Sequence, residues 1–294
     1  MVMNEEELKH YKKAAEIAAV VLKEVQVKPG MKILDLVNGI EKSIENNGGK
    51  PAFPANISCN EFAAHDTASL NDERTIGEKD IVKVDIGVHI EGFIADSAIT
   101  FDLSGENGKL LEAADKALKD AVSTVKAGVN VEKIGGAIEK AIKSYGFKPI
   151  ENLTGHSLGP YMLHAGIEIP NFEARGTGTI LEEGDVIAIE PFATNGVGSV
   201  IEAQRTEIFS AVYEVPVRNT LARQLFKNIK DKYNTLPFAE RWVADTFEKK
   251  IALRELIKSG SIYSYPVLKE KSNGLVSQFE HTMIVEKDSA TILI

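Results

Sequence analysis

The sequence predicts an α/β fold in which two similar halves, each built from helices and strands, share one centre. Three observations lead to this expectation: segments with helical spacing alternate with short apolar segments typical of strands, two of these strands adjoin a tight turn, and part of the chain repeats. With 294 residues, of which 44% are hydrophobic, the chain can bury a sizeable core.

The first helix is predicted to begin at Asn4, because Asn4 and Glu7 have the spacing of a capping box, and to end at Pro29-Gly30. A shift to Lys-rich helical sequence at 207–264 predicts an insertion within a main domain of 1–206 and 265–294. The other elements are expected in this order: a helix over about 33–46, strands over 81–90 and 93–101, helices near 107–126 and 130–145, a strand over 186–190 and strands within 275–286.

An internal repeat connects the two halves. Residues 28–51 match residues 126–149 at an offset of 98, with nine identities in 24 positions. His65 and His164 follow at an offset of 99, and residues 77–85 match 182–190 at an offset of 105, which places Asp85 opposite Glu190. We therefore expect a pseudo-two-fold axis, across which each half brings a histidine and a carboxylate on a strand to one shared centre.

Composition narrows the class of protein. The 34 Lys and Arg against 43 Asp and Glu give a net charge of −9, which disfavours a nucleic-acid partner. No stretch approaches the ~20 apolar residues of a membrane span, and the acidic start lacks the apolar segment of a secretory signal. The single cysteine, Cys59, cannot form an internal disulfide, which fits a reducing cytoplasm. A monomer is the default expectation.

Two aspartates lie in the predicted hairpin. If Glu91-Gly92 is its turn, Gly87 faces Asp96, and Asp85 and Asp96 become diagonal neighbours on one face. Two carboxylates in an apolar sheet raise each other's pKa unless a cation lies between them. We expect Gly87 to leave room there for something other than a side chain.

Three further residues complete a candidate metal site: His156 in TGHSLG, Glu190 in AIEPF and Glu280 in QFEHT. Four carboxylates and a neutral imidazole carry a charge of −4, which two divalent cations balance. Ligands of this kind suit Mn, Fe(II), Co or Zn. Two such ions in one site favour hydrolysis of a bound carbonyl.

The ordered set VDIG, IADSA, TGHSLG, AIEPF and QFEHT, with an insertion before the last motif, resembles the pita-bread metallopeptidases. GHS rather than GHG narrows the resemblance to type II methionine aminopeptidases, in their short archaeal-like form. It implies a curved antiparallel sheet with outer helices and a helical insertion subdomain. It also implies removal of the initiator methionine from nascent polypeptides with a small second residue, and a ribosome-docking surface on the insertion.

The resemblance also implies roles for individual residues. Asp85 would chelate one metal, Asp96 and Glu280 would bridge both, and His156 and Glu190 would complete the other. Glu190 would also move a proton from the attacking water to the leaving amine. The remaining residues implied to contact the substrate are His65 and His164 at the scissile amide and the developing oxyanion, and Phe53, Leu163, Phe192 and Tyr265 around the methionine side chain. The four apolar residues could equally be ordinary core.

One position departs from the family pattern, and two other functions stay open. Type II enzymes often have a histidine near the start of the insertion, whereas VIEAQRTEIFSAV has none. An Xaa-Pro aminopeptidase or prolidase would share the fold but usually carries a separate N-terminal domain, and here the first helix is expected at residue 4. An inactive binding protein of this fold, such as an RNA or ribosome factor, usually lacks a metal ligand, and here all five are present.

Overall fold

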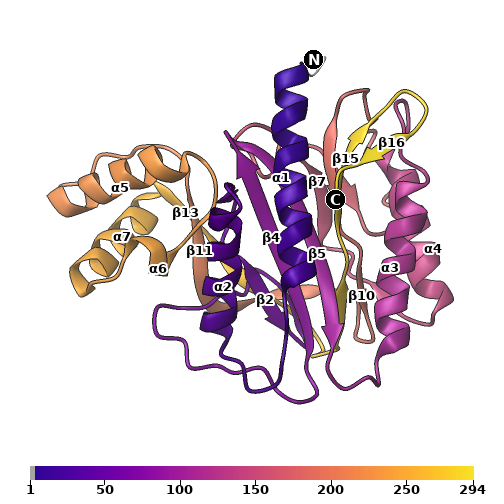
Figure 1. Ribbon diagram of the computed structural model, residues 1–294, viewed down its shortest axis with the longest axis horizontal. Helices are drawn as coiled ribbons and strands as arrows, with labels where there is room; N and C mark the ends of the chain where they lie inside the picture. Colours follow the sequence, from indigo (N-terminus) through magenta and orange to yellow (C-terminus); the bar gives the residue numbers. More distant parts are fainter. Residues whose placement is uncertain (1–3) are drawn as a thin grey trace.

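The computed structural model describes residues 4–294 as helices packed on curved antiparallel sheets (Figure 1). The helices are α1 (Glu5–Glu24), α2 (Ile33–Asn46), α3 (Gly108–Val122), α4 (Val131–Ser144), α5 (Thr220–Tyr233), α6 (Glu240–Val243) and α7 (Phe247–Ser259). The strands are β1 (Lys50–Pro51), β2 (Asn56–Cys59), β3 (Phe62–Ala64), β4 (Ile81–Ile90), β5 (Phe93–Asp102), β6 (Lys148–Pro149), β7 (Thr154–Ser157), β8 (Glu168–Pro170), β9 (Val186–Ile189), β10 (Phe192–Thr194), β11 (Val200–Ala211), β12 (Phe238–Ala239), β13 (Ile262–Glu270), β14 (Val276–Gln278), β15 (His281–Val285) and β16 (Ala290–Ile292).

Helix α1 begins where the sequence predicts but ends earlier. The Asn4 side chain accepts a hydrogen bond from the Glu7 amide at 2.9 Å, and the Asn4 amide donates to the Glu7 carboxylate at 2.9 Å, which confirms the capping box. The helix ends at Glu24 rather than at Pro29-Gly30. The reason is tertiary, because the Gly30 amide donates to the Ile76 carbonyl at 2.7 Å, and the chain must extend to reach that partner.

The predicted hairpin is confirmed as β4 and β5. Ile90 pairs with Phe93 and Gly87 with Asp96, in the expected register. Glu91 and Gly92 form the turn with φ of 49° and 91°. Two successive positive φ values are typical of the type I′ turn, whose twist matches that of the flanking strands.

The internal repeat is confirmed as a repeat of structure. Helices α2 and α4, strands β1 and β6, and strands β2 and β7 begin and end at positions 98 apart, and β4 and β9 begin 105 apart. Even the isolated bridges repeat, since Lys32 pairs with Thr75 and Asn130 pairs with Ile180. In Figure 1, α1 and α2 cover the first half, and α3 and α4 lie along the second. The two halves are therefore versions of one unit.

Side-chain hydroxyls join the two halves. Thr282 on β15 accepts a hydrogen bond from the Asp96 amide at 2.8 Å and donates to the Asp96 carbonyl at 2.7 Å. The Ser97 hydroxyl donates to the Glu280 carbonyl at 2.9 Å. These contacts hold the backbones of Asp96 and Glu280 side by side where the halves meet.

The interval predicted as a helical insertion contains α5, α6 and α7, drawn in orange at the left of Figure 1. These helices pack around a core of their own that includes Phe226, Leu253 and Leu256. The interval also contains strand residues, because β11 runs to Ala211 and β13 begins at Ile262. The domain boundaries at 206/207 and 264/265 stay a prediction. None of the described helices has the length and apolar character needed to span a membrane.

Candidate metal centre

One cavity of about 200 Å³ collects the residues singled out from the sequence. All eleven lie in its wall: Phe53, His65, Asp85, Asp96, His156, Leu163, His164, Glu190, Phe192, Tyr265 and Glu280. They come from both halves of the repeat and from β13 beyond the insertion helices. The structure therefore brings together side chains that are up to 227 positions apart (53 to 280) in the sequence.

Two of the carboxylates lie at a break in strand pairing. Strand β9 pairs with β15 up to Ile189 opposite His281, and β10 resumes the same register with β14 from Phe192 opposite Gln278. Glu190 and Glu280 thus fall opposite each other in the gap, and the residue after Glu190 is a proline, which has no amide to donate. The sequence predicted that a strand ends at Glu190, but it placed Glu280 within strand sequence over 275–286. The break frees both residues from the ladder and turns them to the cavity.

The donor atoms lie close together, and three of the four carboxylates keep an oxygen without a hydrogen-bond partner. His156 Nε2 is 3.7 Å from Asp96 Oδ2 and 3.8 Å from Glu190 Oε1. Asp96, His156 and Glu280 each place one ligand atom within 4.8 Å of the others. Asp85, Asp96 and Glu280 each keep one buried carboxylate oxygen without a hydrogen-bond partner. Such atoms are costly unless something satisfies them, and a cation does so.

The pKa values of the cavity carboxyls also indicate a site for a cation. Burial raises the pKa of Asp85 to about 7. Burial, and then the neighbouring carboxylates, raise the pKa values of Asp96, Glu190 and Glu280 well above the usual range. Glu270 provides the contrast, because the amides of Val197, Ser272 and Gly274 donate to it and its pKa is lowered. The cavity carboxylates are therefore arranged for a cation and not for backbone donors.

Two histidines stand at the cavity without being in the carboxylate cluster. His65 lies after β3 with a positive φ of 62°, and its Nδ1 is 3.2 Å from the Pro266 carbonyl. Burial lowers its pKa to about 4, so a neutral His65 donates from Nδ1 and keeps Nε2 as an acceptor. His164 is exposed and stands edge-on to His156, with ring centroids 4.6 Å apart.

The space over Gly87 corrects one expectation. We expected it to admit something other than a side chain. A Cβ placed on Gly87 would instead lie 2.3 Å from Cε1 and 2.5 Å from Cδ1 of Phe53, so that ring already fills the space. The reason is packing across β1 and β4, which brings Phe53 over the sheet beside Ala52. Gly87 therefore serves the apolar wall of the cavity.

Gly87→Ala is accordingly expected to push Phe53 into the cavity. Overpacking of this kind costs about 1–3 kcal/mol of folding stability. Because the displaced ring narrows the cavity, KM for a peptide substrate should also rise, by roughly tenfold. The matched control is Gly39→Ala on the exposed face of α2, where a Cβ meets nothing within 4 Å. Steady-state kinetics of the three proteins measure the effect, and an unchanged KM in Gly87→Ala would contradict this role of Phe53.

Other lining residues were missed from the sequence. Asn56 and Thr154 line the cavity, and they are 98 positions apart, so extending the repeat could have found them. Ile208 and Pro237 occupy the side nearest the insertion helices, where the sequence lacks the family histidine. No sequence signal marks these two, because only the packing of the insertion brings them to the cavity.

Comparison with known proteins agrees with these features. The chain matches the model of metallopeptidase family M24 over residues 9–287. It is 50% identical to the methionine aminopeptidase of Thermococcus onnurineus, with 95% of this chain and 97% of the relative covered, and 53% identical to that of Archaeoglobus fulgidus, with 91% and 90% covered.

The fold has solved counterparts. The structure of methionine aminopeptidase from Thermotoga maritima superposes with a TM-score of 0.73 at 23% identity and covers 100% of this chain and 98% of that one. This likeness concerns the fold alone, and it confirms the pita-bread arrangement expected from the sequence. Because the family model spans nearly the whole sequence and the two relatives are covered over 97% and 90% of their lengths, the chain belongs to metallopeptidase family M24.

Proposed function

We propose that the chain is a methionyl aminopeptidase that removes the initiator methionine from nascent polypeptides with a small second residue. The observation that carries this proposal is the cavity itself, in which four carboxylates, three of them with a buried oxygen that has no hydrogen-bond partner, and a neutral imidazole adjoin an apolar wall. The full-length relatives named methionine aminopeptidase support the substrate.

The metal proposal follows from the donor set. Asp85, Asp96, His156, Glu190 and Glu280 would hold two divalent ions, whose charge of +4 balances the four carboxylates. Bound divalent ions supply polarisation of the scissile carbonyl and a lowered pKa for the attacking water. Mn, Co, Fe(II) and Zn all suit this donor set, and the experiment below separates them.

The chain's own residues supply the proton transfer and the hydrogen bonds to the substrate. Glu190 is a carboxylate in the cavity wall, so it can accept a proton from the attacking water and deliver it to the leaving amine. His65 Nε2, as an acceptor, suits the N–H of the scissile amide, and His164 suits the developing oxyanion as a donor. Both histidines then stabilise charge and geometry without being metal ligands.

The methionine side chain would occupy the wall formed by Phe53, Leu163, Phe192 and Tyr265. The Tyr265 hydroxyl is 3.2 Å from the Ser210 hydroxyl, so the phenol already has a polar partner outside the substrate. The wall therefore offers an apolar and aromatic surface, which suits a flexible thioether.

The test is hydrolysis of Met-Ala-Ser and Pro-Ala-Ser by metal-stripped protein to which Mn, Co, Fe(II) or Zn is added back separately. Metal-dependent release of methionine alone is the expected result, and it ranks the metals. Release of proline would favour an Xaa-Pro aminopeptidase. If circular dichroism shows that the protein is folded but neither peptide is hydrolysed with any metal, a non-catalytic binding protein of this fold would be favoured.

We further propose that the protein works as a monomer in the cytoplasm and that the insertion docks on the ribosome. Exposed basic side chains on α5 and α7, among them Lys227, Lys232, Arg254 and Lys258, support the docking surface. Reversing these charges should reduce co-sedimentation with ribosomes. Unchanged co-sedimentation would count against docking through this surface and leave the proposed activity intact.

A further inference from the structure

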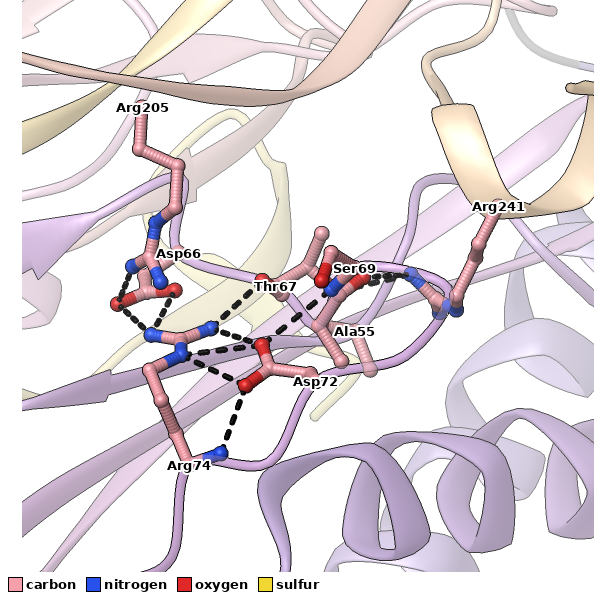
Figure 2. A network of polar contacts seen from close by, with 9 residues as sticks. Ala55, Asp66, Thr67, Ser69, Asp72, Arg74, Arg205 and Arg241 are labelled. Carbon is pink, nitrogen blue, oxygen red and sulfur yellow. Dashed lines mark hydrogen bonds and ion pairs between the residues drawn. The ribbon is translucent and has the colours of Figure 1, made fainter. Parts of the chain in front are cut away.

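A buried charge cluster lies directly beside His65. The Asp66 carboxylate is 1% exposed, and both of its oxygens accept hydrogen bonds from Arg74 Nη1 at 3.0 Å. Arg205 Nη2 on β11 forms an ion pair with the same carboxylate. Figure 2 shows the Asp66 carboxylate held between the two guanidinium groups. The backbone of His65 is thus one peptide bond away from an ion-paired anchor.

The Arg74 guanidinium group hydrogen-bonds to several residues within the segment from His65 to Arg74. Its Nε and Nη2 donate to Asp72 at 3.0 Å and 2.6 Å, and Nη2 also donates to the Thr67 carbonyl at 3.1 Å. One guanidinium therefore ties three points of the segment together, as the centre of Figure 2 shows. Arg205 then fixes this closed segment to β11, which pairs with β13, the strand that contacts the His65 ring.

His65 needs such an anchor. A histidine at φ of 62° is in the left-handed region, which costs energy and persists only when its surroundings fix it. Its ring has two contacts on β13, the Nδ1 contact with the Pro266 carbonyl and an edge-on contact with Tyr265 at 5.6 Å between centroids. Both contacts depend on where the backbone of His65 lies relative to β13.

The second half of the repeat has no aspartate at the equivalent position. In the repeat, Ala165 stands where the first half has Asp66, since His164 corresponds to His65. A buried ion pair is also weak support for stability, because apolar residues of similar volume often do as well. Two guanidinium groups instead fix the position and orientation of a carboxylate, because each presents its N–H donors in a rigid plane.

We propose that Asp66, held between Arg74 and Arg205, is a positioning residue that fixes the His65 imidazole at the cavity wall. The inference rests on the role proposed above for His65 at the scissile amide. Arg205 acts through Asp66, and Asp66 acts through His65. None of the three carboxylate and guanidinium groups lines the cavity, so their effect on the reaction passes through the histidine.

The activity test is a double-mutant cycle on the metal-loaded enzyme with Met-Ala-Ser. His65→Ala should lower kcat by roughly 100-fold, as removal of one transition-state contact does. Asp66→Asn should lower kcat by roughly 10- to 100-fold with KM changed less than about twofold, and should have no further effect in the His65→Ala background. Equal losses in both backgrounds would overturn the proposal, as would an unchanged kcat in Asp66→Asn.

Arg205 supplies a variant that tolerates change, because its side chain is 30% exposed. Arg205→Met should lower kcat as Asp66→Asn does. Arg205→Lys should recover part of kcat, because a lysine keeps the positive charge but lacks the planar N–H donors of the guanidinium group. The matched control is Arg175→Met, which removes an arginine from an exposed pair with Glu173 at 3.8 Å and should leave kcat unchanged.

A second readout needs no activity. The chain has six histidines, so ring signals in a ¹H–¹⁵N spectrum can be assigned to His65 with His65→Ala. Arg205→Met should shift or broaden the His65 ring signals, while Arg175→Met should not. Unperturbed His65 signals in Arg205→Met would overturn the positioning role, whereas failure of wild-type protein to hydrolyse Met-Ala-Ser would overturn the proposed function and leave this result standing.

Discussion

Glu190→Gln is expected to lower kcat for Met-Ala-Ser at least about 1,000-fold while leaving the protein folded. The amide has the shape of the carboxyl but can neither accept the proton of the attacking water nor release it to the amine. General acid–base catalysis alone contributes about 10²- to 10⁴-fold, and the substitution also removes one of the expected metal ligands. The Gln278 amide, which donates to Glu190 Oε2 at 3.1 Å, can still donate to the Gln oxygen, so packing should be kept.

The control for this substitution is Glu207→Gln. Burial raises the pKa of Glu207 to about 7, yet this residue does not line the cavity. It therefore separates a carboxyl that is merely buried from one that acts on substrate. Steady-state kinetics with each metal should show wild-type kcat in Glu207→Gln. A kcat for Glu190→Gln within tenfold of wild type would assign the proton transfer to another group.

The sequence predicted which carboxylates share one cavity because the constraints on them are local and repeated. Asp85 and Asp96 lie in a hairpin whose register follows from the Glu91-Gly92 turn, and the observed pairs agree with it. The repeat places Asp85 opposite Glu190, and the helices and strands of the two halves keep the same offsets. Periodicity of two and a tight turn are enough to say which side chains share a face.

The features that the sequence missed all depend on contacts between distant segments. Phe53 fills the space over Gly87 because β1 packs against β4, and nothing in either segment alone states this. The pairing of Asp66 with Arg205 joins positions 139 apart (66 to 205). In the sequence, Arg205 has the same appearance as any basic residue on a solvated strand. Its role becomes visible only once tertiary structure buries its partner.

The raised pKa values of the four cavity carboxyls should make the folding stability of the metal-free protein depend strongly on pH. The folded-state pKa is about 7 for Asp85, and burial with the neighbouring carboxylates raises the pKa values of Asp96, Glu190 and Glu280 well above their usual range, whereas all four carboxyls titrate near 4 in an unfolded chain. The stability that such raised pKa values contribute is fully present below the unfolded pKa and is lost as the pH rises through the folded pKa.

The metal-free protein should therefore lose stability as the pH rises from about 7.5 to 8.5, above the range in which unfolded histidines titrate. Five histidines have lowered folded-state pKa values (His65, His89, His156, His164 and His281). Above pH 7.5 their rings are neutral in the folded state and largely neutral in the unfolded state, where the pKa is about 6.5. Lys83 works in the opposite direction, because burial lowers its pKa to about 7, but it is one group against four. A net excess of two protons in the folded state corresponds to a loss of about 3 kcal/mol per pH unit.

Saturating divalent metal should reverse this slope, because the ions bind the deprotonated carboxylates and release the protons. Urea unfolding of stripped and Mn-loaded protein at about pH 7.5 and about pH 8.5 measures both slopes. Asp96→Asn should flatten the slope of the stripped protein by about one proton, or about 1.4 kcal/mol per pH unit, and should weaken stabilisation by the metal. Glu270→Gln is the matched control, because backbone amides already satisfy that buried carboxylate, so its removal should lower stability without flattening the slope. A stripped protein whose stability stays level or increases across this window would mean that the four carboxyls do not share one buried site without a cation.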